Sequence, residues 1–75
     1  MNVILAGAKN LEIILNGEPH ETEAQTLAAL CAALGVEGLK IATAVNNAFV
    51  PVAARGQTIL KTHDRVEIVS PRQGG

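Results

Sequence analysis

The chain has 75 residues, a formal net charge of −1 at pH 7 and 48% apolar residues, with Phe49 as its single aromatic residue. A domain of this length buries only about 60% of the surface that its unfolded chain exposes, so we expect one domain with a thin aliphatic core. A large enzyme and a membrane bundle are excluded, and without a basic net charge, Trp or Tyr no nucleic-acid partner is expected.

The N-terminal part predicts a β-hairpin at the edge of a sheet. Residues 1–9 precede it, either as an N-terminal extension or as an extra edge segment. Residues 11–15 alternate between the two faces of a strand, and Asn16-Gly17 is typical of a type I′ turn, in which both central residues need positive φ. Residues 18–22 form the return strand, which Pro19 places at a sheet edge because proline donates no ladder hydrogen bond.

Residues 26–35 predict a short helix. Thr26 suits the N-cap, because its hydroxyl can accept a hydrogen bond from the first turn, and Gly35 suits the left-handed residue that ends a helix. Because free cysteine often packs as a small hydrophobe, we expect Cys31 to lie in the core rather than act as a nucleophile. Spacing at i, i+3, i+4 and i+7 predicts one buried stripe of Leu27, Leu30, Cys31 and Leu34.

The next segment predicts a second hairpin. Residues 41–45 form a third strand, Asn46-Asn47 a turn, and Phe49-Val50 a short fourth strand that ends at Pro51.

The C-terminal part predicts one irregular segment and one strand. Residues 53–60 are irregular with about one helical turn, and Ile59 and Leu60 are available to fill the core. Residues 65–69 form the last strand, with Val66 and Ile68 facing inward.

These elements predict an α+β domain over residues 10–69, in which one main helix packs on one face of a mixed four- to five-stranded sheet. Residues 70–75 predict a flexible C-terminal tail, because Pro71 discourages strand pairing and Gly74-Gly75 is the least constrained dipeptide.

Cysteine usage and hydropathy predict a cytoplasmic protein. Cys31 is the only cysteine, so no internal disulfide can form, whereas small secreted domains usually need them. The apolar run over residues 3–8 is too short to span a bilayer and no basic segment precedes it. We therefore expect neither a signal peptide nor a membrane partner.

Four segments together are typical of one family: Leu15-Asn16-Gly17-Glu18, then Ala44-Val45-Asn46 with Val50-Pro51, then residues 64–69, and finally Gly74-Gly75. Over residues 11–75 the sequence resembles the ubiquitin-like sulfur carrier family of the β-grasp fold, most closely its thiamine-biosynthesis branch, ThiS. Three positions depart from the family pattern. Val52 replaces an arginine that often follows the Val-Pro pair, residues 53–58 lack the usual aromatic, and Thr62-His63-Asp64 replaces Asp-Gly-Asp.

The resemblance implies that the chemistry takes place on the carboxylate of Gly75. In the family, an E1-like adenylating enzyme of the ThiF type uses ATP and Mg to adenylate this carboxylate. A cysteine desulfurase or another persulfide donor then supplies sulfur, and the resulting thiocarboxylate serves a thiazole synthase of the ThiG type. The carrier itself is no enzyme and binds no cofactor, and its Arg72, Gln73 and Gly74 would lie in the partner's channel.

A partner surface is predicted next to the tail. Strand alternation places Ile14, Ala42, Ala44 and Val69 on the face opposite the helix, although scattered small surface residues would give the same pattern. Arg65 and Arg72 are candidates to pair with acidic groups of the adenylating enzyme.

Other functions remain open from the sequence. The same fold serves molybdopterin sulfur transfer and ubiquitin-like protein modification, and a non-catalytic interaction module with an inert tail would belong to a different class. His20 and His63 lack a spaced second ligand, so no metal site is expected.

Overall fold

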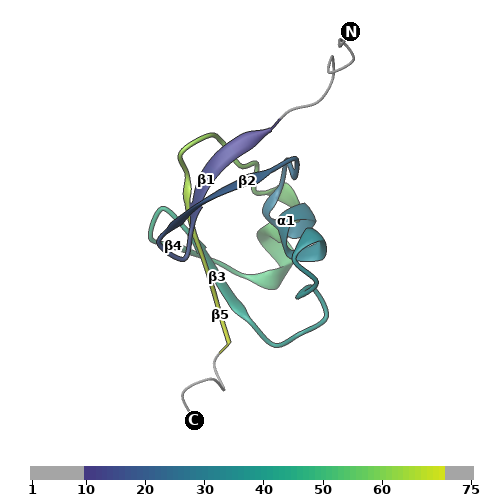
Figure 1. Ribbon diagram of the computed structural model, residues 1–75. Coiled ribbons are helices and arrows are strands. Elements are labelled where there is room, and N and C mark those ends of the chain that lie inside the picture. Colours follow the sequence, from purple (N-terminus) through teal and green to yellow (C-terminus); the bar gives the residue numbers. More distant parts are fainter. Residues whose placement is uncertain (1–9, 71–75) are drawn as a thin grey trace, which may run out of the picture.

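A five-stranded mixed sheet is the frame of the protein, as seen in a computed structural model that describes residues 10–70 (Figure 1). An α-helix and a 3-10 helix accompany it in this part of the chain. The elements are, in chain order, β1 (Leu11–Leu15), β2 (Glu18–Thr22), α1 (Leu27–Ala33), β3 (Ala42–Val45), β4 (Ala48–Val50), η2 (Val52–Gln57) and β5 (Arg65–Val69).

The strand order is β2-β1-β5-β3-β4, which places the last strand at the centre of the sheet. β5 runs parallel to β1 and antiparallel to β3, while β1–β2 and β3–β4 are antiparallel hairpins. The predicted mixed sheet with one main helix is confirmed, with five strands. β2, which contains Pro19, lies at an edge as predicted.

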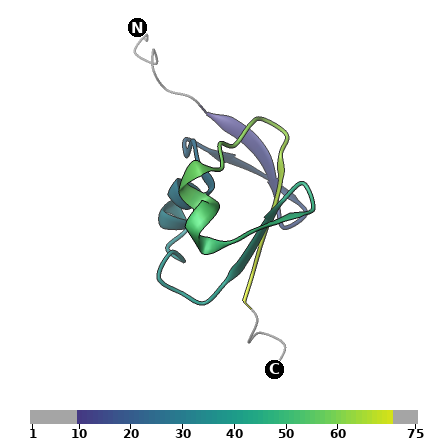
Figure 2. The ribbon, with the colours of Figure 1, turned by 180° about the vertical axis from the view of Figure 1, so that it is seen from behind.

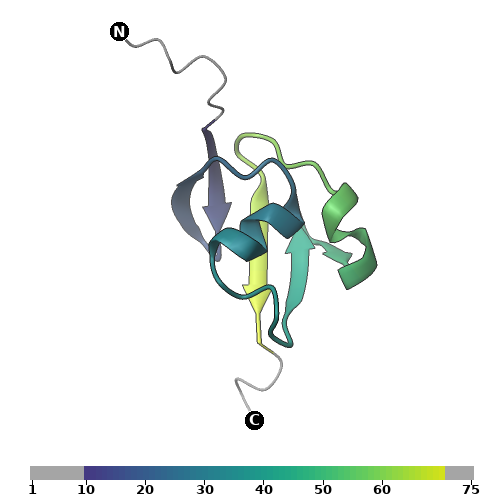
Figure 3. The same ribbon diagram turned by 90° about the vertical axis from the view of Figure 1, so that its right-hand side faces the viewer.

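α1 and η2 cover one face of the sheet, and no described element covers the other (Figures 1 and 2). Figure 3 shows α1 crossing in front of β5. The helix begins as predicted, because the Thr26 side chain accepts a hydrogen bond from the Ala29 amide at 3.1 Å. Neither described helix is long and apolar enough to cross a bilayer. The core between helix and sheet contains Ile13, Leu27, Leu30, Cys31, Val50, Leu60 and Val66.

The segment after β4 differs from the prediction in one respect. Leu60 is buried, with 3% of its surface exposed, but Ile59 is 61% exposed, so its predicted core position is wrong. Ile59 forms an isolated antiparallel bridge with Thr26, and Leu60 donates its amide to the carbonyl of Gln25 at 2.9 Å. This extended pairing turns neighbouring side chains in opposite directions, so only one of the two can enter the core.

Two asparagines in the hairpin turns hold β5 in place. Asn16 and Asn46 both have positive φ, at 50° and 51°. The Asn16 side chain accepts from the Ile68 amide at 2.9 Å and donates to the Ile68 carbonyl at 3.2 Å. The Asn46 side chain accepts from the Arg65 amide at 2.9 Å and donates to Asp64 Oδ1 at 3.0 Å. The two turns therefore fix opposite ends of the same strand.

We expect Asn46→Ala to lower the free energy of unfolding by about 2–3 kcal/mol, because two side-chain hydrogen bonds are lost at a residue with positive φ. The adjacent Asn47, with φ of 71°, makes no side-chain hydrogen bond within residues 10–70 and is the matched control. Asn47→Ala should cost about 1 kcal/mol, the backbone contribution alone. Urea denaturation measures both, and equal losses would show that the hydrogen bonds of Asn46 contribute nothing.

Candidate functional site

The candidate site begins where β5 ends, since the chain leaves the sheet there toward its C-terminus. β3 pairs with β5 up to Val69, through the pairs Ala42–Val69 and Thr43–Ile68. On the other side, β1 pairs with β5 only at Ile14–Arg65 and Leu15–Val66. The Asn16 side chain extends this pairing by bonding both backbone groups of Ile68. The backbone of β5 is therefore held on both sides almost to Ser70, the last described residue.

The face of the sheet away from α1, which we call the outer sheet face, contains the predicted partner residues of the described chain. Register places them together, because residues directly opposite each other in paired strands point to the same face. Ile14 lies opposite Arg65, and Ala42 lies opposite Val69. We restrict the name outer sheet face to the part of it around β5, which comprises Ile14, Ala42, Ala44, Phe49, Arg65, Glu67 and Val69.

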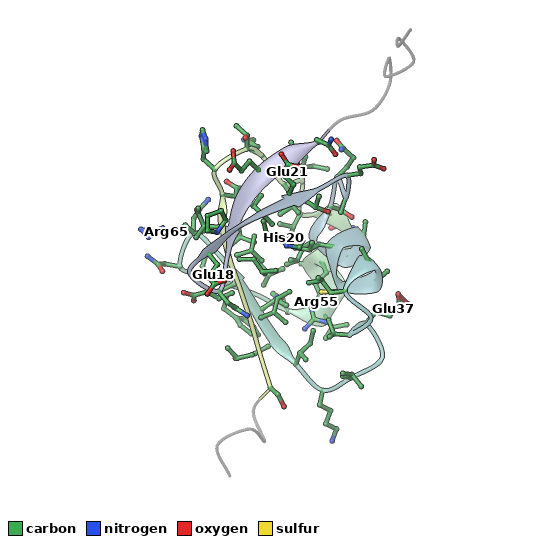
Figure 4. All side chains as sticks on the ribbon, viewed as in Figure 1. Glu18, His20, Glu21, Glu37, Arg55 and Arg65 are labelled. Atoms are coloured by element: carbon green, nitrogen blue, oxygen red, sulfur yellow. The ribbon has the colours of Figure 1, made fainter. Side chains whose placement is uncertain are left out.

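Two residues of the outer sheet face, Phe49 and Glu67, were not predicted from the sequence. Ala44 is flanked by Glu67 on β5 and by Phe49 on β4. Phe49 is 70% exposed and Val69 is 56% exposed, so both project apolar surface into solvent. The signal for Phe49 was present, because a two-residue turn at Asn46-Asn47 forces Ala44 and Phe49 to be neighbours. Figure 4 shows Arg65 on this side of the sheet, away from α1.

The predicted tail residues lie outside residues 10–70, the part of the chain that the structure describes. Arg72, Gln73, Gly74 and Gly75 therefore keep the roles that the family resemblance gives them as predictions. The same holds for residues 1–9, predicted as an extension or an extra edge segment.

The thiol of Cys31 packs in the core and is 1% exposed. Burial raises the pKa of this thiol above its ordinary value, the charge of Arg55 acts against this, and Glu37 adds to it. A thiol that holds its proton is a poor nucleophile. Within residues 10–70, no group of three or more His, Cys, Asp or Glu side chains is placed to hold a metal ion.

The fold and the exit of the chain from a central strand define a β-grasp protein of the ubiquitin-like class. The crystal structure of a thiamine biosynthesis protein, ThiS, from Geobacter metallireducens matches with a TM-score of 0.70. That match covers 80% of this chain and 93% of the other, at 23% sequence identity, and so concerns the fold. The ThiS family model matches residues 12–75, and the chain belongs to the ThiS family of sulfur carriers.

A curated relative adds a second observation. A thiazole synthase from Magnetococcus marinus is 39% identical over 66 residues, which make up 87% of this chain. The chain spans 20% of the length of that relative. The similarity is thus to one segment of a much longer protein.

We expect iodoacetamide at pH 8 to label Cys31 at least about tenfold more slowly than an exposed thiol, because its raised pKa and burial both reduce thiolate access. Ala33→Cys is the matched control, since it adds an exposed thiol to the same helix. Mass spectrometry should show that this variant takes up one label fast and the second slowly. Rapid uptake by the unmodified protein would contradict the assignment of Cys31 to the core.

Proposed function

We propose that this chain is the sulfur carrier for thiazole formation in thiamine biosynthesis, and that the carboxylate of Gly75 carries the sulfur. The family match, which includes Gly74 and Gly75, supports this assignment. The relative that is a thiazole synthase supports the pathway, because a segment like this chain lies within it. The acceptor of the sulfur would then be a thiazole synthase of the ThiG type.

The proposed reaction is acyl transfer at Gly75. A carboxylate is a poor electrophile, so a ThiF-type partner first activates it. The Gly75 carboxylate attacks the α-phosphate of ATP, which releases pyrophosphate and gives an acyl adenylate. A persulfide then attacks the acyl carbon and displaces AMP. A second thiol reduces the resulting acyl disulfide and leaves the thiocarboxylate. The catalytic groups and the Mg belong to the partners, and the chain supplies the acyl group.

The structural contribution of the chain is positional. The proximity of reacting groups lowers the barrier of such a step only if the acyl carbon is placed next to the nucleophile in the correct orientation. The backbone of β5 is bonded on both sides up to Ile68, so docking of the sheet fixes the point from which the tail starts. Glycines without Cβ at 74 and 75 let the backbone of the tail approach the nucleotide closely.

We expect Gly75 deletion to abolish sulfur loading and Gly75→Ala to slow it by about tenfold or more, because a Cβ crowds the reacting carbonyl. The protein is incubated with ATP, Mg, a ThiF-type enzyme and a persulfide donor, and its intact mass is followed. The unmodified chain should exchange one oxygen for one sulfur. Gly56→Ala is the control, since a Cβ at Gly56 meets no atom within 4 Å.

Each alternative result of this experiment argues against the proposal. Sulfur on the chain lacking Gly75 would refute Gly75 as the residue whose carboxylate must carry the sulfur. A bond from Gly75 to a lysine of another protein would indicate a modifier, and an unchanged mass with an active enzyme would indicate an inert tail.

The outer sheet face is the proposed docking surface for the adenylating enzyme, and Val69 is the test position nearest the tail. We expect Val69→Asp to slow adenylation by about tenfold, because a buried unpaired carboxylate at an interface costs several times RT. Ile59→Asp is the matched control, since Ile59 is 61% exposed but lies outside this face. Pyrophosphate release measures the rate, and an equal effect of both substitutions would remove the outer sheet face from the mechanism.

A further inference from the structure

Arg55, which sequence reasoning did not single out, is a buried cation on the helix side of the sheet. It lies in η2 and only 7% of its surface is exposed. Its Nε donates to Thr43 Oγ1 at 3.1 Å, and its Nη2 donates to the Ile41 carbonyl at 3.0 Å. The Thr43 hydroxyl in turn donates to the Val50 carbonyl at 2.7 Å. These bonds fix the guanidinium between η2 and β3.

The guanidinium has neutral partners but no anionic one within residues 10–70. Both of its hydrogen-bond acceptors are uncharged oxygens, and no carboxylate of the described chain forms an ion pair with it. Buried charges in proteins are normally paired, because removing an ion from water is costly. A buried guanidinium that lacks a carboxylate therefore points to an anion supplied from outside.

The unused end of the guanidinium reaches the surface. Nη1 of Arg55 has no hydrogen-bond partner within residues 10–70. Every fully buried side-chain nitrogen or oxygen in the same range does have one, so Nη1 is not among the fully buried atoms. Nη1 is therefore accessible to solvent. Arg55 lines an open hollow of about 370 Å³ between α1 and η2, and this hollow is the surface that Nη1 can face.

The wall of the hollow restricts the kind of anion. Apart from Arg55, it consists of Ala28, Ala29, Cys31 and Val52 with the carboxylate-bearing Glu37. The four small or apolar residues suit an apolar body. Glu37 is exposed and lines the same hollow as Arg55, so its charge opposes a dianion more than a monoanion. The volume falls in the range of small-molecule pockets.

We propose that the hollow between α1 and η2 is a binding site for a monocarboxylate with a small apolar body, and that Arg55 binds its carboxylate. The Nη1 hydrogens and the remaining Nη2 hydrogen form the free end of the guanidinium fork, which can take both carboxylate oxygens. The carboxylate belongs either to a free acid or to an acidic side chain of a partner protein. The site lies on the opposite side of the sheet from the outer sheet face, so it is independent of the proposed docking for sulfur loading.

The test is a titration of the full chain, observed by NMR at the Arg55 Nε–H and at the amides of Ala28, Ala29 and Val52. Sodium isobutyrate is the probe for a free acid, and a blocked Ala-Glu-Val peptide is the probe for a protein side chain. Isobutyramide has the same shape without charge, and inorganic phosphate tests for general anion binding. We expect saturable shifts with isobutyrate or the peptide and none with isobutyramide, and the probe that saturates at lower concentration identifies the source.

Variants assign the binding to Arg55. Arg55→Gln should weaken binding by about tenfold or more, as expected for loss of a charged hydrogen bond, whereas Arg65→Gln on the outer sheet face should leave it unchanged. Because Arg55→Gln also removes bonds to β3, Glu37→Gln provides a test at an exposed residue. It should tighten binding by about two- to fivefold, since a like charge is removed.

Four results would overturn the proposal. The first is that neither isobutyrate nor the peptide gives saturable shifts, and the second is that isobutyramide gives equal shifts. The third is binding of phosphate alone, and the fourth is unchanged affinity in Glu37→Gln. The result of the titration does not depend on sulfur loading, so failure here leaves the proposed function standing.

Discussion

The central position of β5 is the constraint on which the rest of the structure depends. A strand in the middle of a sheet needs a correctly placed neighbour on each of its two sides, and here the last strand of the described chain takes that position. Each neighbour belongs to a hairpin, and each hairpin turn carries an asparagine with positive φ whose amide bonds the backbone of β5 or the residue before it. The two turns thus set the register of the whole sheet, because β5 is the one strand that links its two hairpins.

This arrangement gives the sheet two faces with different surroundings. One side of the sheet is occupied by α1 and η2, whose apolar residues make the core and whose Arg55 joins η2 to β3. The other side has no covering element within residues 10–70 and presents Phe49 and Val69 beside Arg65 and Glu67. A thin domain can therefore expose apolar side chains on one face without giving up core residues, since the strands contribute alternate side chains to each face.

Local sequence determined much of this fold. The turn at Asn16-Gly17, the N-cap at Thr26 and the edge position of Pro19 each follow from the chemistry of one or two neighbouring residues, and each was predicted. The sequence did not predict which of Ile59 and Leu60 enters the core. That choice depends on pairing with residues 25 and 26, which are far away in the sequence. Burial of Arg55 likewise depends on oxygens of Ile41 and Thr43 that only the folded sheet brings near. The candidate site was predictable on the strands by alternation, while the chemistry proposed for it rests on tail residues outside residues 10–70 and on partners.

The parallel pairing of β1 with β5 has a practical consequence for how this domain can be joined to others. Two parallel neighbouring strands start at the same end of a sheet, so β1 enters the domain at the end opposite to the one from which β5 leaves (Figure 1). Asn10 and Ser70, the first and last described residues, therefore lie at opposite ends of the sheet. Affinity tags, solubility partners or whole domains can be placed at the Asn10 end without competing for the space around the C-terminal exit, which makes the N-terminal side the appropriate attachment point for immobilised or tethered forms of the protein.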